Sequence, residues 1–553
     1  MHLLTVEDLS VSFPGSVAVR GLSFSVDAGQ CVAIVGESGS GKSVTARTLV
    51  GLAGDNATVT ARNLRLGDKD LRQLSPSQWR SVRGRHIGFV LQDALVSLDP
   101  LKTIGSEIAE ALTQHVDLSR KEARQKVLDL LASVGIPDPQ ERVGQYAHQL
   151  SGGLRQRALI ASAIAADPAL LIADEPTTAL DVIVQAQVLS LLRDMKAKGT
   201  GLILISHDLA VVASLADHII VLKDGAVVEA GSPDRIFSDP QAPYTRALLA
   251  AIPSATTKGR KLTADTPPST SSDAPGRRED GIALEARALI KRLGSRLAVD
   301  HVTLTLRTGE TLGLVGASGS GKTTLARLLL GLQQPDRGEV TLRGQSWSGL
   351  SERQRRPLRP RIQLVSQDPL GSFDPRYRVM DIIAEALEIA GAPKSDWRAR
   401  AAELILSVGL SEAHLYRRPR QLSGGQRQRV AIARALAMEP EILICDEPVS
   451  ALDVSTQAQV LDLLDDLKKQ FGLTVLFISH DLGVVHHVSD RVMVMHAGKI
   501  VEEGPVDEIF LNPRAAYTRE LLAALPRLPT HRPFATHESR NDRTGRDTLS
   551  VSA

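Results

Sequence analysis

Two short glycine-rich segments in this sequence have the spacing needed to hold a phosphate group. Gly36–Ser43 reads Gly-Glu-Ser-Gly-Ser-Gly-Lys-Ser, and Gly316–Thr323 reads Gly-Ala-Ser-Gly-Ser-Gly-Lys-Thr. Each follows an apolar run and leads into a helical pattern, so backbone N–H groups and the positive helix end face the phosphates. The lysine pairs with the β- and γ-phosphates, and the final hydroxyl reaches Mg²⁺. The predicted positions are Gly36, Ser38, Gly39, Gly41, Lys42, Ser43, Gly316, Ser318, Gly319, Gly321, Lys322 and Thr323.

A pair of adjacent carboxylates ends another apolar run in each half of the chain. Leu-Ile-Ala-Asp-Glu ends at Glu175, and Leu-Ile-Cys-Asp-Glu ends at Glu447. Transfer of a phosphoryl group to water needs a carboxylate that supports the metal and a group that positions the water. We therefore expect Asp174 and Asp446 to support Mg²⁺, and the two glutamates to position the water. An isolated Asp-Glu is more often a solvated turn, but its recurrence behind a phosphate loop favours the catalytic interpretation.

These motifs form a tandem repeat, which indicates that one domain has been duplicated. Leu-Ser-Gly-Gly at Leu150 recurs at Leu422, in the same order relative to the other motifs. The stretch 254–281 is rich in Thr, Ser, Pro and charge, which is typical of a flexible linker, and the end of the chain has a similar composition. We expect a first domain at 1–253, a flexible linker at 254–281, a second domain at 282–526 and a disordered tail at 527–553.

Short apolar runs that alternate with helical stretches predict an α/β fold with a parallel sheet covered on both faces. Helices are expected at Ser43–Leu52 and Thr323–Leu332, directly after the glycine loops. The expected strands are Cys31–Val35, Leu170–Ala173, Leu202–Ile205, Thr311–Val315, Ile442–Cys445 and Thr474–Ile478.

Bulk composition excludes several classes of protein. The chain has 553 residues, 65 Lys and Arg against 63 Asp and Glu, and a formal net charge of +2. This balance gives no argument for a nucleic-acid partner. Cys31 and Cys445 are the two cysteines, too few for a disulfide framework. No secretory signal is visible, and no apolar run approaches the roughly 18 residues of a spanning helix. We expect a protein that is soluble or peripheral to a membrane.

Together the motifs resemble the ATP-binding cassette (ABC) family over nearly the whole chain outside the linker and tail. The resemblance is carried by Leu-Ser-Gly-Gly, by Asp-Glu-Pro followed by Ala-Leu-Asp ending at Asp181 and Asp453, and by Ser-His-Asp around His207 and His480. It implies two tandem P-loop ABC nucleotide-binding domains, each with a RecA-like α/β core and a helical subdomain. It also implies ATP hydrolysis with Mg²⁺.

The resemblance further implies that each ATP lies between the phosphate loop of one domain and the Leu-Ser-Gly-Gly signature of the other. Each histidine would contact the γ-phosphate, and Gln92 and Gln367 would contact Mg²⁺ or the attacking water. One site would combine Lys42, Gln92, Asp174, Glu175 and His207 with Ser423, Gly424 and Gly425. The other would combine Lys322, Gln367, Asp446, Glu447 and His480 with Ser151, Gly152 and Gly153.

Two further segments are similar to the oligopeptide and dipeptide importer ATPases, in a form with both cassettes fused. The segments around the two glutamines share Ser-x-Asp-Pro, and Pro243–Leu249 and Ala516–Leu522 share the end pattern Tyr-Thr-Arg-x-Leu-Leu. The family implies two transmembrane permease subunits, an extracytoplasmic substrate-binding protein, and a location at the cytoplasmic face of the inner membrane. The family often carries an iron–sulfur cluster. With Cys31 and Cys445 alone, we expect none here, because a cluster needs about four thiolates.

Other functions remain as alternatives at this stage. A tandem cassette can act on ribosomes or nucleic acid, but zinc-type cysteine pairs, a charged helical linker or a basic patch would then be expected. An exporter half would need spanning helices. Within the importer interpretation, the cargo can be a peptide, glutathione, a nickel chelate, an opine or a sugar, because cargo is selected by other subunits.

The two copies differ where the family places an aromatic side chain against adenine. Phe13 precedes the first glycine loop by the same number of residues as Leu293 precedes the second. Stacking of a base on an aromatic ring is worth roughly 1–3 kcal/mol. We therefore expect the Lys42 site to bind ATP more tightly than the Lys322 site, unless Arg292 supplies a planar guanidinium for stacking. The alternative is that Phe13 is an ordinary core aromatic.

Overall fold

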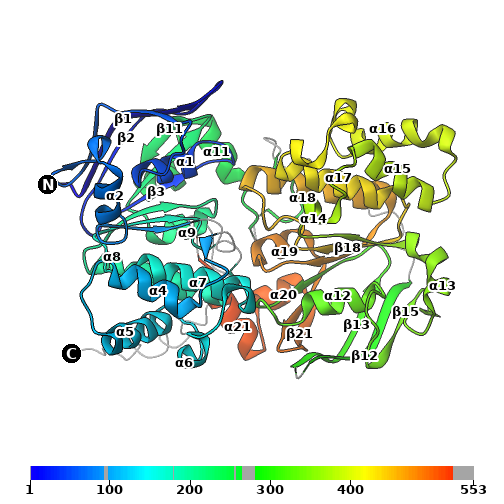
Figure 1. Cartoon of the computed structure of the whole chain (residues 1–553). Coiled ribbons are helices and arrows are strands. Elements are labelled where there is room, and N and C mark those ends of the chain that lie inside the picture. Colours follow the sequence, from blue (N-terminus) through cyan, green and yellow to red (C-terminus); the bar gives the residue numbers. More distant parts are fainter. Residues whose placement is uncertain are drawn as a thin grey trace, which may run out of the picture.

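The repeat in the sequence folds as two cassettes of the same design that lie side by side (Figure 1). The first cassette runs from β1 to α11 and the second from β12 to α21. The structure is a computed structural model that describes residues 2–91, 97–177, 180–254, 257–263, 281–294, 296–526 and 528.

A six-stranded sheet forms the centre of each cassette, and its strands are parallel except for the last, which is antiparallel. In spatial order the first sheet contains β7 (Ile87–Val90), β8 (Leu170–Asp174), β9 (Gly201–Ile205), β3 (Cys31–Val35), β10 (His218–Lys223) and β11 (Ala226–Gly231). The second contains β17 (Ile362–Val365), β18 (Ile442–Asp446), β19 (Thr474–Ile478), β14 (Thr311–Val315), β20 (Arg491–His496) and β21 (Lys499–Pro505).

A smaller antiparallel sheet packs on one face of each central sheet. Its core residues form one cluster with alternate residues of the central strands, such as Val32 and Ile34 of β3. The first contains β1 (Leu4–Phe13), β2 (Ser16–Val26), β4 (Thr58–Thr60), β5 (Asn63–Leu66) and β6 (Lys69–Asp70). The second contains β12 (Ile282–Leu293), β13 (Arg296–Arg307), β15 (Arg337–Leu342) and β16 (Gln345–Ser346).

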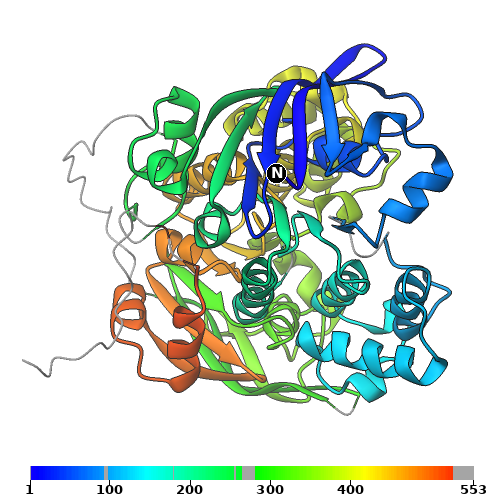
Figure 2. The same cartoon turned by 90° about the vertical axis from the view of Figure 1, so that its left-hand side faces the viewer.

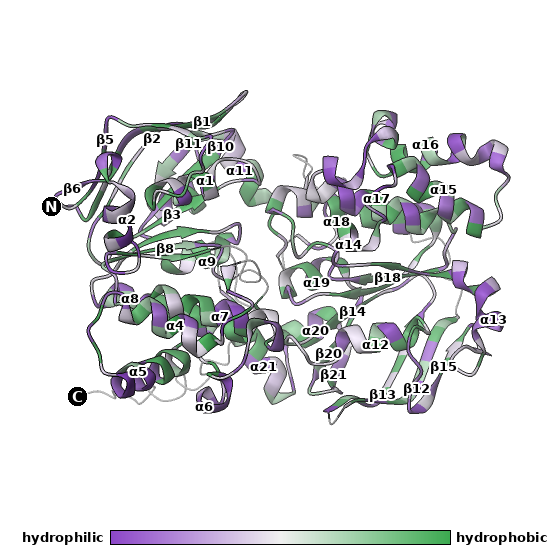
Figure 3. Ribbon diagram, in the orientation of Figure 1, coloured by the Kyte–Doolittle hydropathy of each residue, from purple (hydrophilic) through white to green (hydrophobic). Residues whose placement is uncertain are grey.

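Helices cover the other face, where Cys31, Ala33 and Val35 of β3 join a cluster that includes the helical subdomain. Figure 3 shows the central strands as hydrophobic and the outer helix faces as hydrophilic. The first cassette has α1 (Lys42–Leu49), α2 (Pro76–Val82), α4 (Ile104–Thr113), α5 (Arg120–Ser133), α6 (Pro139–Arg142), α7 (Gly152–Ala163), α8 (Val182–Ala197), α9 (Leu209–Leu215), α10 (Pro233–Ser238) and α11 (Pro243–Ala250). The second has α12 (Lys322–Leu329), α13 (Glu352–Arg355), α14 (Pro369–Ser372), α15 (Val379–Ile389), α16 (Trp397–Ser407), α17 (Gly424–Leu436), α18 (Val454–Phe471), α19 (Leu482–Val488), α20 (Val506–Leu511) and α21 (Ala516–Ala523).

The α/β class and the two-cassette organisation are therefore confirmed. Both helices after the glycine loops end three residues earlier than predicted, at Leu49 and Leu329. Gly51 explains the first of these ends, since its φ of 65° lies in the left-handed region and the following N–H, of Leu52, donates back to Arg47 O at 2.7 Å. This is the hydrogen-bond pattern of a Schellman C-cap.

Part of the predicted linker is held on the second cassette. The Leu262 side chain is 4% exposed and packs in that cassette's core, and both Leu262 N and Thr263 N donate to the carboxylate of Asp462 at 2.9 Å. Within the predicted linker, residues 261–263 therefore have hydrogen-bond acceptors on α18. The remainder, 264–280, and nearly all of the predicted tail lie outside the described residues.

Candidate nucleotide sites

Each phosphate loop connects a buried central strand to a helix and holds its lysine inside the loop. Lys42 Nζ donates to Gly36 O at 2.8 Å and to Glu37 O at 2.6 Å. Lys322 Nζ donates to Gly316 O at 2.7 Å and to Ala317 O at 3.0 Å. Burial lowers the pKa of both lysines, while the nearby acidic side chains favour the charged form. Each loop therefore presents a cation beside backbone N–H groups, as phosphate binding requires.

Glycine is required at the first position of each loop for steric reasons. Gly36 has a φ of 147°, and a Cβ there would lie 2.2 Å from Leu222 O on β10. Gly316 has a φ of 155°, and a Cβ there would lie 2.1 Å from Met495 O on β20. The loop can turn tightly over the neighbouring strand only because this side chain is missing.

The oxygen atoms beside each loop fit Mg²⁺. Ser43 Oγ donates to Asp174 Oδ1 at 3.1 Å, whereas Asp174 Oδ2 and Asp446 Oδ1 are buried without a hydrogen-bond partner among the described residues. Burial raises the pKa of Asp174 to about 6 and raises that of Asp446, because nearby cations such as Lys42 and Lys322 offset only part of the effect of burial. A hydroxyl and a carboxylate are oxygen ligands of the kind that Mg²⁺ prefers. When bound, the ion would neutralise charge on the phosphates.

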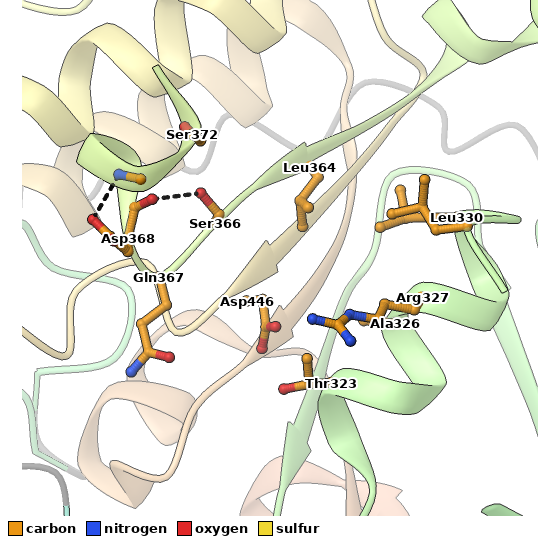
Figure 4. A pocket seen from close by; sticks show the side chains of 12 residues that line it. Thr323, Ala326, Arg327, Leu330, Leu364, Ser366, Gln367, Asp368, Ser372 and Asp446 are labelled. Carbon is orange, nitrogen blue, oxygen red and sulfur yellow. Dashed lines mark hydrogen bonds between the residues drawn. The ribbon is translucent and has the colours of Figure 1, made fainter. Parts of the chain in front are cut away.

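In the second cassette these residues line a cavity of about 490 Å³. Figure 4 shows Thr323 of α12 and Asp446 at the end of β18 pointing toward each other, with Gln367 on the same side of the cavity. Arg327 also lines it, from the second turn of α12. The cavity thus lies beside the phosphate loop and contains the predicted metal-supporting groups.

A glutamate and a histidine form a pair in each cassette. His207 Nδ1 lies 3.3 Å from Glu175 Oε1, and His480 Nδ1 lies 3.3 Å from Glu447 Oε2. Burial opposes a charge on each imidazole, but the hydrogen bond and charge of the glutamate outweigh it and raise the histidine pKa. Gln367 Nε2 donates to Glu447 Oε2 at 2.9 Å, so three predicted residues of the second site meet.

In each cassette, an aspartate at the N-cap of the helix after the Asp-Glu-Pro motif contacts the opposite cassette. Asp453 caps α18 and also accepts from Ser38 N of the first loop at 3.4 Å. Asp181 caps α8 and accepts from Ser318 N of the second loop at 3.3 Å. The two cassettes are therefore arranged head to tail around their phosphate loops. Figure 2 shows the first cassette from its outer side, with elements of the second behind it.

The signature segments lie next to these aspartates. Ser423 caps α17, and a Cβ at Gly424 would lie 3.5 Å from the side chain of Leu452, the residue before Asp453. Ser151 caps α7, and a Cβ at Gly153 would lie 3.4 Å from the side chain of Leu180. Because each aspartate reaches the opposite loop, each signature lies near that loop as well.

Gln92, Phe13 and Leu293 were also predicted to belong to the nucleotide sites. Gln92 lies outside the described residues. Phe13 and Leu293 occupy equivalent ends of β1 and β12. Phe13 is partly buried against the first core, whereas the Leu293 side chain is 46% exposed. Arg296, which was not among the predicted residues, donates to Gly319 O of the second loop.

Sequence reasoning missed the roles of Asp181, Asp453 and Arg296. The two aspartates belong to the Ala-Leu-Asp motifs, but their contacts depend on how the cassettes pack. Recurrence of an aspartate at a helix start in both copies was the available signal. For Arg296, the signal was an arginine across the hairpin turn from Leu293, the position where the second copy lacks the aromatic residue.

Comparison with known proteins agrees with this geometry. Residues 19–178 and 299–450 match the ABC transporter family, and residues 228–277 and 501–548 match the oligopeptide/dipeptide transporter C-terminal region. The chain is 44% identical to the glutathione import ATP-binding protein GsiA of Escherichia coli (strain K12), over 95% of this chain and 90% of the relative. It is 45% identical, with the same coverage, to the protein of that name from Shigella flexneri.

The chain therefore belongs to the ABC transporter family, and the predicted family is confirmed. It is an ATPase, an ATP-hydrolysing subunit that powers import, in the group that carries the oligopeptide/dipeptide transporter C-terminal region. Archaeal ribosome recycling factor aABCE1 and RNase-L inhibitor each have a TM-score of 0.60 and 22% identity. They cover 90% and 91% of this chain, and the same shares of their own chains. That likeness shows the fold alone.

Proposed function

We propose that this ATPase energises the import of short peptides, with glutathione as the first candidate. The observation that carries the proposal is that the phosphate loop of each cassette contacts the opposite cassette, in a chain that carries the oligopeptide/dipeptide transporter C-terminal region twice. Relatives that align with nearly the whole chain are named as glutathione import proteins. Glutathione is itself a tripeptide, so both lines of support point to one class of cargo.

The assembly that we propose contains two transmembrane permease subunits and an extracytoplasmic substrate-binding protein. Import subunits of this family work with permease and binding components in general. Among the described residues, each helix is too short or too polar to span a bilayer. We propose that the chain binds the cytoplasmic face of the membrane through its permease and has no nucleic-acid partner.

In the proposed sites, Lys42 and Lys322 bind the β- and γ-phosphates, and Glu175 and Glu447 position the attacking water. His207 and His480 contact the γ-phosphate, while Gln92 and Gln367 contact Mg²⁺ or the water. Ser43 and Asp174 hold Mg²⁺ in one site, and Thr323 and Asp446 hold it in the other. The signature of the opposite cassette closes each site, with Ser423, Gly424 and Gly425 over the Lys42 loop and Ser151, Gly152 and Gly153 over the Lys322 loop.

We propose that the two domains are 1–253 and 282–526, connected by 254–281. We also propose that the protein holds no iron–sulfur cluster. Cys31 and Cys445 are buried in the central strands of different cassettes, and burial raises the pKa of both thiols to about 12. A cluster requires several thiolates at one place. Iron and acid-labile sulfide determination on the purified protein is the corresponding test.

The cargo is tested by reconstituting the chain with its permease and binding protein in liposomes. Glutathione, a dipeptide, an oligopeptide, a nickel chelate and an opine are supplied in turn on the binding-protein side. The proposal predicts that glutathione or a short peptide stimulates ATP hydrolysis and accumulates inside in an ATP-dependent manner. Stimulation by a nickel chelate or an opine, with no response to any peptide, would overturn the cargo assignment and leave the ATPase intact.

A further inference from the structure

The repeated C-terminal segment contacts the phosphate loop of its own cassette through a tyrosine. Tyr244, in the first turn of α11, accepts a hydrogen bond from Glu37 N at 3.1 Å through its hydroxyl. Tyr517, at the same place on α21, accepts from Ala317 N at 3.0 Å. Because the contact is made with the main chain, it is the same in both copies although the loop residue differs.

The residue held by each tyrosine also contacts the phosphate-binding lysine. Glu37 donates its N–H to Tyr244 and accepts from Lys42 Nζ at its carbonyl oxygen. In the second cassette, Ala317 is held in the same way between Tyr517 and Lys322. One loop residue therefore links each tyrosine to the lysine of the same loop. The tyrosine holds the part of the loop that directly follows the central strand.

A glutamate, buried in the first cassette and half-buried in the second, fixes the start of the helix that carries each tyrosine. Glu229 of β11 accepts from Gln241 N at 2.8 Å and from Ala242 N, the N-cap of α11, at 3.0 Å. Glu502 of β21 accepts from the two N–H groups before α21 in the same manner, at 2.7 and 3.0 Å. The start of each C-terminal helix is thus tied to the sheet edge. Burial raises the pKa of Tyr244 to about 12, so its hydroxyl stays protonated.

The C-terminal helices also pack on the opposite cassette. Helix α11 contacts α18, and α21 contacts α8, the two helices that begin with the cross-contacting aspartates. Ala251, just after α11, is 5% exposed and joins the core of the second cassette. Figure 1 shows α21, in red, beside the first cassette. Each helix therefore spans from its own phosphate loop to the other half of the molecule.

We propose that Tyr244 and Tyr517 are positioning residues that fix the phosphate loop of their own cassette, and that the C-terminal helices brace these loops against the opposite cassette. The inference rests on the proposed nucleotide sites. It gives the C-terminal region a role in nucleotide binding, which explains why a full copy follows each cassette.

The test measures ATP affinity at one site at a time in the full chain, with the lysine of the other site replaced by alanine. Tyr244→Phe removes only the hydroxyl. It is expected to raise the Kd and KM for ATP at the Lys42 site about two- to tenfold, as for one lost hydrogen bond, with a smaller change in kcat. The Lys322 site stays unchanged. Tyr517→Phe is expected to weaken ATP binding at the Lys322 site by a similar factor and to leave the Lys42 site unchanged.

Hydrogen exchange supplies a second readout, because loss of the acceptor should speed exchange of the Glu37 amide. The matched control is Tyr416→Phe, which removes an exposed hydroxyl that accepts from Arg398 Nη2 at 3.2 Å, and it should change neither site. Unchanged affinity and exchange in Tyr244→Phe, or equal losses at both sites, would overturn the inference. If Lys42→Ala itself left binding at its site intact, the proposed nucleotide site would fall, and the tyrosine role with it.

Discussion

Glu175 and Glu447 combine an unusual backbone conformation with the central position in each site. Their φ angles are 52° and 51°, in the left-handed region that costs non-glycine residues roughly 1–2 kcal/mol. Each N–H is held by the neighbouring strand, through Ile205 O and Ile478 O at 2.9 Å. Strain of this kind persists only where surrounding structure fixes it, and here it directs a carboxylate toward a histidine next to the phosphate loop.

The first prediction is that Glu175→Gln and Glu447→Gln each slow hydrolysis at their own site while ATP still binds. We expect a loss of about 10²–10⁴-fold in turnover, because water activation is removed. Affinity should stay close to the parental value, since Lys42 and Lys322 are untouched. Single-site turnover and equilibrium binding measure the two effects. A double variant that hydrolysed ATP at the parental rate would refute the roles of both glutamates.

The second prediction concerns the pKa of His480, which Glu447 raises above its ordinary value although burial opposes this. The stabilisation from this pair is fully present below the unfolded-state pKa and is lost as pH rises through the higher folded-state pKa. In Glu447→Gln the charge disappears but the burial remains, so the pKa of His480 should fall. NMR titration of the imidazole measures it. Glu439→Gln, at a surface position, is the control, and an unchanged pKa in Glu447→Gln would contradict the pairing.

At the scale of elements, the segment 257–263 is held to the second cassette by polar contacts around one buried carboxylate. Asp462 of α18 accepts from Leu262 N, from Thr263 N and from Thr263 Oγ1. Lys261 pairs with Asp466 one turn further along the helix. The segment therefore ties the end of the first cassette to the helix that begins at the cross-contacting Asp453.

The third prediction is that Asp462→Ala releases this segment. Buried N–H groups would lose their acceptor, at a cost of about 1–3 kcal/mol. We expect faster hydrogen exchange over 257–263 and faster tryptic cleavage after Lys258, Arg260 and Lys261. The control is Asp465→Ala, which removes a more exposed carboxylate that pairs with Lys469 within the same helix. Equal protection in the Asp462 and Asp465 variants would show that Asp462 does not hold the segment.

Six of the central strands, β3 and β14 among them, could be predicted from sequence because they are fully buried and read as short apolar runs. Their neighbours β7, β10, β17 and β20 were not predicted. The antiparallel strands could not, since in β1 buried and more exposed positions alternate and mix with polar residues. The docking of 257–263 could not be predicted either. Its composition is that of a linker, and its order depends on Asp462, some 200 positions away. Likewise, the Tyr244 and Tyr517 contacts are made with backbone atoms, which leave no complementary residue type to recognise.

At the scale of the whole molecule, the two sites share a plan but differ at the edge where adenine is expected. Phe13 ends β1 and packs against the first core, whereas Leu293 ends β12 and Arg296 donates to Gly319 O of the second loop. We propose that Phe13 supplies an aromatic face for adenine in the first site. In the second site the corresponding side chains are Leu293 and Arg296, and the Arg296 guanidinium already donates a hydrogen bond to the loop.

The fourth prediction is that the Lys42 site binds ATP more tightly than the Lys322 site. Loss of a stacking face worth roughly 1–3 kcal/mol corresponds to roughly 5- to 150-fold in affinity. Phe13→Ala should weaken the first site, and Leu293→Phe should strengthen the second. Nucleotide titrations with the other site's lysine replaced separate the two. Equal affinities in the parental sites, with no loss in Phe13→Ala, would contradict the asymmetry.

The central claim is that each ATP is held between the loop of one cassette and the signature of the other. The most direct test counts ATP bound per chain in the Glu175→Gln/Glu447→Gln background. Lys42→Ala should leave one bound ATP. Adding Ser423→Arg should keep that one, because both changes fall in the same site, whereas adding Ser151→Arg should leave none. The opposite pattern, with none bound after Ser423→Arg and one retained after Ser151→Arg, would show that each cassette completes its own site.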